Sequence, residues 1–224
     1  MVNTAEIIMF YLRYTTCDVN MRDILNTTIH SLNHHLRYAG MRAGHRENVA
    51  EHSFFVALIA DWLVADMGRE DVDPAKVMRM ALYHDIEEAY TGDLVTPIKY
   101  RSASLLEEWE RLSSEMLEEG LRSDFPHAPS VEARVRDVHA EYEREKMATA
   151  EGRVVKFADM LQSVVYLLRE MKAGNQHIHG VLSNVLCNLH SLFDHLPEWS
   201  AYLAQVDMLA IDAGVHEHQK KLST

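Results

Sequence analysis

Two histidines and two aspartates lie on segments whose apolar spacing predicts helices. His84 and Asp85 close one such helix, His52 lies on the inward face of an earlier one, and Asp159 lies near the inward side of a later one. A His-Asp dipeptide arises by chance roughly once in a chain of this composition, so it gains weight only from its place at the end of an apolar helix. Together the four side chains offer two imidazoles and two carboxylates, a ligand set that suits Mn²⁺, Fe²⁺, Co²⁺, Ni²⁺ or Zn²⁺.

Each of these residues also has an ordinary structural explanation. A lone histidine on an apolar helix face is more often a core residue, which would account for His84 by itself. Asp159 could cap its helix or pair with Lys156. Buried aspartates without a partner cost several kcal/mol, and a metal ion is one partner that offsets this cost. The spacing alone leaves both explanations open.

The elements that carry these residues are predicted to be helices throughout. No stretch alternates at period two for long enough to predict a sheet, so the fold class is predicted to be all-α. Apolar residues spaced by three and four predict one helix over 22–37, with a stripe of Leu25, Ile29, Leu32 and Leu36. A second helix should run from Asn48 to about Met67 and stop at Gly68. Asp73 followed by Pro74 predicts the start of the helix that ends in His84.

The helical pattern resumes after an irregular stretch. Residues 87–101 contain Thr91, Gly92 and Pro97 and are predicted to form a loop. Apolar stripes then predict helices around Leu105–Met116, Val131–Tyr142 and Val155–Val165, followed by helices over about 177–194 and 198–213, with a turn-rich segment over 120–130.

Composition narrows the class of protein. The 224 residues are 47% hydrophobic and 25% charged, as expected of a globular domain, and we predict a single domain over residues 1–224. The net charge of −12 argues against binding to long nucleic acids, although one pocket can still hold a small anion. Two cysteines, Cys17 and Cys187, predict neither a disulfide framework nor a thiolate metal site, which favours the cytoplasm. No segment is long and apolar enough to predict a membrane span.

An ordered set of motifs resembles a known family. The motifs are Arg37-Tyr38, Met41-Arg42, Glu47-Asn48-Val49-Ala50-Glu51-His52, Tyr83-His84-Asp85, Glu88, Thr91-Gly92-Asp93-Leu94, Thr96-Pro97, Lys99-Tyr100, Lys156 and Ala158-Asp159. This series is similar to the HD-domain phosphohydrolases, an all-α helical-bundle family, and most similar to the bacterial 5'-deoxynucleotidases among them. The resemblance covers about residues 32–175.

The resemblance implies a role for each matched residue. His52, His84, Asp85 and Asp159 would hold one divalent metal, and Asp85 and Asp159 would also face the substrate. Arg37 would bind the phosphate through its guanidinium, and Glu88 would handle the proton of the attacking water. Asp93 would act beside the nucleotide. The remaining substrate contacts would come from Tyr38, Leu94, Val95 and Thr96.

Two positions depart from the family pattern. Tyr38 replaces a tryptophan and Val95 replaces a proline, which leaves the choice of sugar and the length of the phosphate chain open. The first choice of reaction is hydrolysis of a deoxynucleoside monophosphate to deoxynucleoside and phosphate. The alternative is a triphosphohydrolase that releases triphosphate from a dNTP such as dATP. A nucleotide-binding regulator without catalysis is the alternative outside enzymes.

The resemblance also implies a homodimer. The last predicted helix offers the apolar residues Tyr202, Leu203, Val206 and Leu209, which would be buried either within the chain or between two copies.

Overall fold

The computed structural model describes residues 21–94 and 102–215, and every regular element in these two ranges is a helix. The elements in order are α2 (Met21–Asn26), η1 (Thr28–Asn33), α3 (Val49–Met67), α4 (Pro74–Tyr83), α5 (Glu88–Thr91), α7 (Ala103–Asp124), α8 (Pro129–Glu145), α9 (Ala150–Lys172), η2 (Gln176–Ile178), α10 (His179–Phe193), η3 (Pro197–Trp199) and α11 (Ser200–Asp212). The predicted all-α class is confirmed for the described part of the chain.

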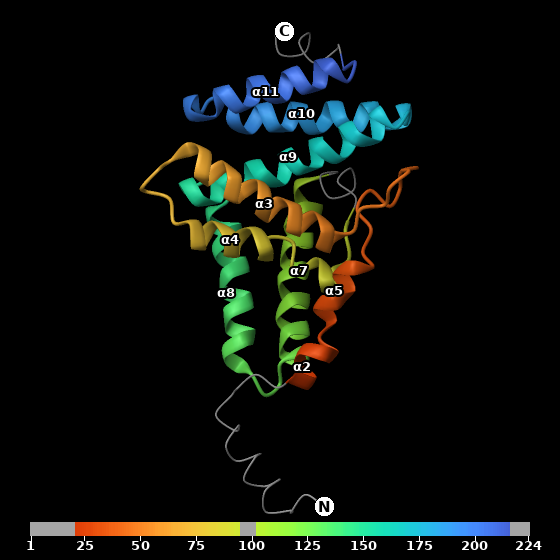
Figure 1. Cartoon of the computed structure of the whole chain (residues 1–224). Coiled ribbons are helices and arrows are strands. Elements are labelled where there is room, and N and C mark those ends of the chain that lie inside the picture. The colour runs from red at the N-terminus through yellow and green to blue at the C-terminus, as the bar shows by residue number, and fades with distance from the viewer. Residues whose placement is uncertain (1–20, 95–101, 216–224) are drawn as a thin grey trace, which may run out of the picture.

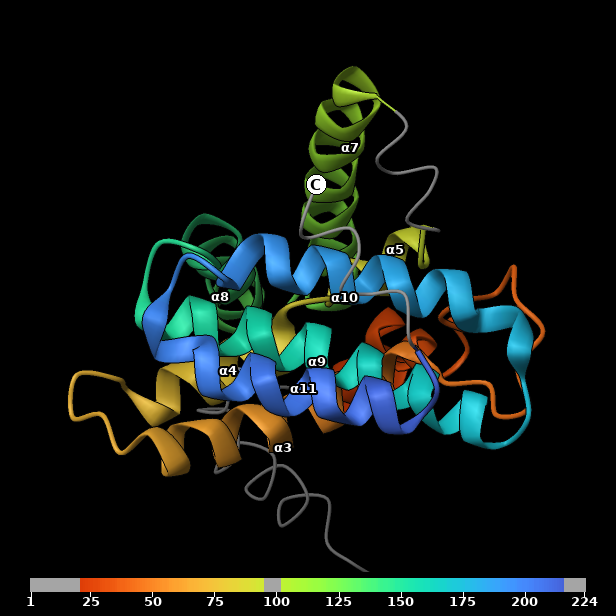
Figure 2. The ribbon, with the colours of Figure 1, turned by 90° about the horizontal axis from the view of Figure 1, so that it is seen from above.

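Helix α9 lies at the centre of the molecule. Helices α3 and α4 pack on one side of it, and α10 packs on the other side with α11 next to it (Figures 1 and 2). Buried residues occur on nearly every face of α9, as expected of a helix enclosed by neighbours. Helices α7 and α8 leave the stack on the side opposite α10 (Figure 1), and α7 projects beyond the body in the view from above (Figure 2).

Local sequence signals account for the two helices that carry the histidines. Helix α3 starts at Asn48, whose side chain accepts a hydrogen bond from the amide of Glu51 while the Glu51 carboxylate caps Asn48 in return. It ends at Gly68, which adopts a left-handed conformation with φ 57°. Helix α4 starts with Asp73 as its N-cap and Pro74 in its first turn. Both predictions are confirmed, and they place His52 and His84 on buried faces.

The single helix predicted over residues 22–37 is wrong. The chain forms α2 and η1 instead, and Leu25 of the predicted stripe is 77% exposed. The break occurs because the Asp124 carboxylate accepts hydrogen bonds from the Thr27 hydroxyl at 2.8 Å and from the Thr28 amide at 2.7 Å. Leu36 then forms an isolated antiparallel bridge with Asn48, and the residues between these two positions form turns and bends instead of a helix.

Two further boundaries differ from the prediction. The predicted loop over 87–101 contains the short helix α5, and residues 95–101 lie outside the described part. Helix α7 continues through Gly120, which the sequence assigned to a turn. The ring of Tyr90 packs where a β-carbon at position 120 would lie, so the glycine at this position serves close packing. The α7 residues that are buried are Ser113, Leu117 and Leu121 rather than the predicted stripe. Within the described residues, none of the helices has the length and apolar character needed to cross a membrane.

Candidate metal centre

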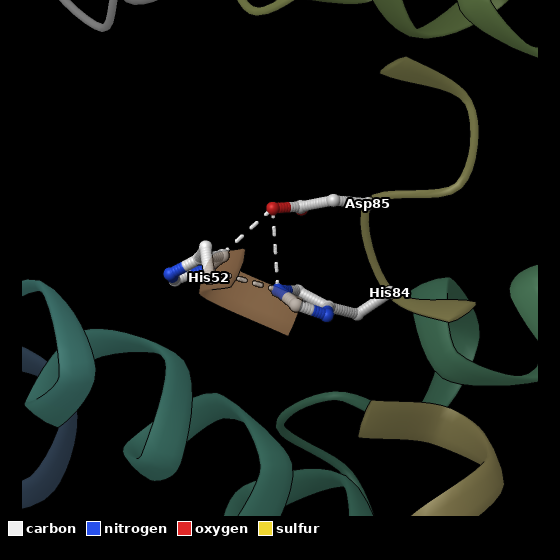
Figure 3. A group of neighbouring side chains, drawn as sticks. All are labelled: His52, His84 and Asp85. Atoms are coloured by element: carbon white, nitrogen blue, oxygen red, sulfur yellow. Dashed lines mark hydrogen bonds and ion pairs between the residues drawn. The ribbon is translucent and has the colours of Figure 1, made fainter. Parts of the chain in front are cut away.

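Three predicted ligands converge at one point between α3 and the end of α4 (Figure 3). The Nε2 atoms of His52 and His84 lie 3.3 Å apart. Oδ2 of Asp85 lies 3.6 Å from Nε2 of His52 and 3.2 Å from Nε2 of His84. Ligand atoms about 2.0–2.1 Å from a shared tetrahedral metal are separated by about 3.3 Å, so these separations fit a single bound ion.

The other nitrogen of each imidazole is already hydrogen-bonded. Nδ1 of His84 lies 2.8 Å from the carbonyl oxygen of Ala81, to which it donates. Nδ1 of His52 lies 2.7 Å from Oε1 of Gln162 and donates to this amide oxygen. Because each Nδ1 carries a proton, the Nε2 atoms are the ones that can offer lone pairs to a metal.

The electrostatics of the group also fit a bound cation. Burial lowers the pKa of His84, but the charge and hydrogen bond of Asp85, together with the charge of Asp159 and the hydrogen bond to Ala81, outweigh burial and raise this pKa to about 9. Burial and the charge of Arg37 lower the pKa of His52 to about 4. Burial would raise the pKa of Asp85, yet His84, His52 and Arg37 hold it well below its usual range. The carboxylates therefore favour positive charge at Nε2 of His84, and a divalent ion bound there would take the place of the Nε2 proton.

The fourth predicted ligand, Asp159 of α9, contacts the group at His52. Its Oδ1 lies 3.2 Å from Nε2 of His52, and its Oδ2 lies 2.7 Å from Nζ of Lys156. The Lys156 charge and His52 overcome burial and hold the pKa of Asp159 well below its usual range. The ion pair with Lys156 and the contact with a metal ligand are both present, so the two explanations for Asp159 are compatible.

Arg37 lies between the metal ligands and α9. Its Nη1 donates to Oδ2 of Asp85 at 3.1 Å, and its Nη2 donates to Oγ of Ser163 at 3.2 Å. Its Nε lies 3.6 Å from Oε2 of Glu47. The side chain is 14% exposed, so a phosphate held by the metal ligands would meet a largely desolvated guanidinium.

Glu87 and Glu88 point to different neighbours. Oε2 of Glu87 lies 2.8 Å from Nε2 of His139 on α8. Glu88 has a buried Oε2 with no hydrogen-bond partner in the described structure, and it interacts electrostatically with Asp85 and Arg37. Burial, reinforced by the carboxylates of Asp85 and Asp93, raises the pKa of Glu88 well above its usual value. Glu88 is thus the member of the pair that lies beside the metal ligands.

The comparison with known sequences identifies the family. A family model described as 5'-deoxynucleotidase YfbR-like matches residues 25–207. The chain belongs to the YfbR-like 5'-deoxynucleotidases. It is 36% identical to the 5'-deoxynucleotidase of Erwinia tasmaniensis over 149 residues, which are 62% of this chain and 69% of that protein. It is also 36% identical to 5'-deoxynucleotidase YfbR of Shigella flexneri, over 62% of this chain and 68% of that protein.

Solved structures share the fold of this YfbR-like chain. An HD-domain phosphohydrolase from Listeria innocua superposes with a TM-score of 0.70 at 22% identity, covering 85% of this chain and 90% of that one. A predicted metal-dependent phosphohydrolase from Magnetospirillum magnetotacticum superposes with a TM-score of 0.60 at 27% identity, covering 87% of this chain and 92% of that one. The cyanophage S-2L HD phosphohydrolase DatZ, bound to dA and one catalytic Zn²⁺, superposes with a TM-score of 0.51 at 22% identity, covering 73% of this chain and 81% of that one. The predicted HD-domain bundle and the hydrolase class are confirmed.

Three of the remaining predicted substrate contacts, Tyr38, Asp93 and Leu94, lie within the described residues of this family member. Asp93 and Leu94 follow α5 and are partly exposed, while Val95 and Thr96 lie outside the described residues. Tyr38, at the position where the family has tryptophan, adopts a positive φ of 53°. Its ring stacks on Tyr166 with the centroids 5.3 Å apart, and the Arg37 guanidinium lies over it at 5.7 Å.

Three supporting residues were not assigned to the site from the sequence. Glu47 and Gln162 link Arg37 to His52, and Ser163 accepts from Arg37. Gln162 lies within the helix predicted around Val155–Val165, and Glu47 lies inside a family motif, but neither signal names a contact. The polar pair Gln162-Ser163 inside the largely apolar stretch 160–168 was the available hint, because buried polar groups require hydrogen-bond partners.

Proposed function

We propose that this chain hydrolyses the 5'-phosphate ester of deoxynucleoside monophosphates with one divalent metal held by His52, His84, Asp85 and Asp159. The observation that carries the proposal is the convergence of two Nε2 atoms and one carboxylate oxygen within 3.2–3.6 Å of one another. The metal, when bound, would polarise a phosphate oxygen and lower the pKa of a water. Its identity among Mn²⁺, Fe²⁺, Co²⁺, Ni²⁺ and Zn²⁺ stays open.

The protein's own groups would supply binding and proton transfer. Arg37 would hold the phosphate with two donor nitrogens where negative charge develops. Glu88 would accept the proton of the attacking water as the new P–O bond forms and the bond to O5' breaks, and it would return that proton to the leaving O5' oxygen. Its raised pKa favours this exchange. Asp93, Tyr38, Leu94, Val95 and Thr96 would contact the nucleotide.

Product analysis tests the choice of substrate. Each dNMP, NMP and dNTP is incubated with the protein and each candidate metal, and the nucleoside, phosphate and triphosphate are separated by chromatography. The expected result is deoxynucleoside and orthophosphate from dNMPs, with dNTPs as poorer substrates. Rapid release of triphosphate from dATP, with dAMP left intact, would instead assign the triphosphohydrolase reaction. Tight dNMP binding without turnover under every metal would favour the regulator.

We also propose that two copies of the chain form a homodimer. Leu203 and Val206 of the predicted apolar face are buried within the chain, so they are not available to a second copy. Helix α3 carries large apolar side chains on its outer side, with Phe54 56% exposed and Trp62 62% exposed, and large exposed apolar groups are typical of an interface. Light scattering should give about 51 kDa, twice the chain mass of 25.7 kDa, and Trp62→Glu should return the mass to that of one chain. Wild-type protein at the mass of one chain would contradict the proposal.

A further inference from the structure

A buried polar chain runs from Arg37 to the metal ligand His52. Nε of Arg37 lies 3.6 Å from Oε2 of Glu47, and the Nε2 amide group of Gln162 donates to Oε1 of Glu47. Oε1 of Gln162 in turn lies 2.7 Å from Nδ1 of His52. Glu47 and Gln162 are each 4% exposed, and His52 is fully buried. Water therefore has little access to these groups, so Gln162 and His52 depend on the hydrogen bonds that they make here. Nε of Arg37 and Oε2 of Glu47 have no hydrogen-bond partner in the described structure and form an ion pair at 3.6 Å.

The direction of the two hydrogen bonds that link Glu47, Gln162 and His52 follows from the carboxylate of Glu47. An ionised carboxylate only accepts hydrogen bonds, so the amide group of Gln162 must turn its NH₂ toward Glu47. The amide oxygen of Gln162 then faces His52 and requires a donor, so Nδ1 of His52 carries the proton. Nε2 of His52 is left with a lone pair directed at His84 and Asp85.

The next residue of α9 has a separate partner. Ser163 accepts a hydrogen bond from Nη2 of Arg37 at 3.2 Å, whereas Gln162 contacts Glu47 and His52. Two adjacent residues of one helix thus support the two halves of the site. This arrangement provides a matched pair of variants, because each removes one support and leaves the other.

We infer that Glu47 and Gln162 are positioning residues that fix His52 as its Nδ1–H tautomer and tie this ligand to the phosphate-binding Arg37. The inference rests on the proposed metal site and adds to it the residues that select which nitrogen of His52 can bind the metal. Partners of this kind typically change metal affinity about 10- to 100-fold when removed.

The tautomer can be measured on the wild-type chain without a variant. The full-length protein, labelled with ¹⁵N-histidine and freed of metal by a chelator, is examined by NMR, and the His52 ring is assigned by the signals lost in His52→Asn. The expected spectrum shows the proton of His52 on Nδ1. A proton on Nε2 with a bare Nδ1 would overturn the inference, whatever the enzymatic activity.

The two α9 variants separate positioning from general loosening. Gln162→Leu should weaken binding of Co²⁺ alone by about 10- to 100-fold, while inorganic phosphate binds the Co²⁺-saturated variant as tightly as wild type. Ser163→Ala should leave the affinity for Co²⁺ within about twofold of the wild-type value and weaken the binding of phosphate by about threefold to tenfold. Glu47→Gln should weaken the binding of both Co²⁺ and phosphate. Thermal melting of each variant establishes that it is folded.

The outcomes distinguish this inference from the proposed function. Unchanged Co²⁺ affinity in folded Gln162→Leu, or equal loss of both ligands in Gln162→Leu and Ser163→Ala, overturns the positioning role. The double variant Glu47→Gln with Gln162→Glu provides a second test, because the carboxylate at position 162 can still accept from Nδ1 of His52 while the amide at position 47 donates to that carboxylate, so Co²⁺ binding should recover relative to Gln162→Leu. A wild-type protein that binds neither Co²⁺ nor dNMP would refute the proposed function, and the tautomer measurement would still test the inference.

Discussion

Two clusters of histidine and aspartate occur among the described residues, and their geometry differs. At the first, between α3 and α4, two imidazoles and Asp85 bring Nε2 and Oδ2 atoms together. At the second, between α10 and α11, His190 alone faces two carboxylates. Its Nδ1 lies 2.7 Å from Oδ1 of Asp194, and its Nε2 lies 2.8 Å from Oδ1 of Asp207.

The difference lies in where the ring nitrogens direct their protons. His52 and His84 each donate from Nδ1 to an oxygen outside the cluster, which leaves both Nε2 atoms able to face a cation. Both nitrogens of His190 face carboxylates, so this ring is suited to be the cation itself. The same residue types therefore give a ligand set in one place and an ion pair between two helices in the other.

Exposure separates the two clusters further. His52 is fully buried and the side chain of Asp85 is 19% exposed, whereas the carboxylates that face His190 are 50% and 37% exposed. An ion pair with exposed carboxylates contributes little to stability because water screens it. Substitutions at the first cluster should therefore alter chemistry, and substitutions at the second should alter stability slightly.

The largest effect is expected for Asp85→Ala. Asp85 contributes the carboxylate oxygen of the converging group and also pairs with Arg37. Its removal should abolish stoichiometric binding of the metal and lower dNMP hydrolysis by at least about 10³-fold. Elemental analysis after gel filtration and a phosphate-release assay measure the two effects.

The matched control for this variant is His190→Gln at the second cluster. It changes a histidine that also faces two aspartates, yet it should retain the metal and the activity of wild type. Equal metal content in Asp85→Ala and wild type would remove Asp85 from the site, and loss of metal in His190→Gln would erase the distinction between the clusters.

A smaller loss is expected when proton transfer is removed and the ligands stay. Glu88→Gln should keep metal and bind dNMP but lose about 10³-fold in kcat, because the amide cannot accept the proton of the water. Glu87→Gln is the control, since Glu87 pairs with His139, and it should lose far less. If Glu87→Gln proves the more damaging change at equal metal loading, the assignment along α5 is wrong.

Arg37→Lys should reduce kcat/KM by about 10²-fold with the metal retained. A lysine keeps the charge but cannot reach Asp85 and Ser163 with two separate donors as Arg37 does. Arg42→Lys, at an exposed arginine of the same loop, should leave kcat/KM unchanged. Steady-state kinetics of both variants with dNMP test this, and equal losses would indicate a general charge effect instead of specific phosphate binding.

Local signals made much of the fold predictable. Helices α3 and α4 follow from Asn48, Gly68, Asp73 and Pro74, which act on backbone groups within a few residues. The predicted helix over 22–37 failed because the group that ends it, Asp124, is 97 residues away from Thr27 in the sequence. A leucine stripe carries no information about such a distant acceptor.

The same limit applies to the site. Residue type and the family motifs pointed to His52, His84, Asp85 and Asp159, and the structure brings these residues together. Their roles stay predictions until the variants are measured. Gln162 lies 110 residues from His52 in the sequence, and nothing at either position states that their side chains meet. Which side chains hydrogen-bond to a metal ligand depends on how the helices pack against one another, and the spacing of residues within one helix does not determine this packing.

The smallest effect is expected at His190, and its sign depends on pH. Burial lowers the pKa of His190, but hydrogen bonds to Asp194 and Asp207 outweigh burial and raise it above 6.5. A raised pKa in the folded state means that the ion pair stabilises the fold fully below the unfolded pKa and that this stabilisation is lost as the pH rises through the folded pKa. His190→Gln should therefore cost up to about 1 kcal/mol at pH near 6, and less at alkaline pH. Urea unfolding at both pH values measures the difference in free energy, and a cost that grows toward alkaline pH would show that His190 acts as a neutral packing residue instead of a cation.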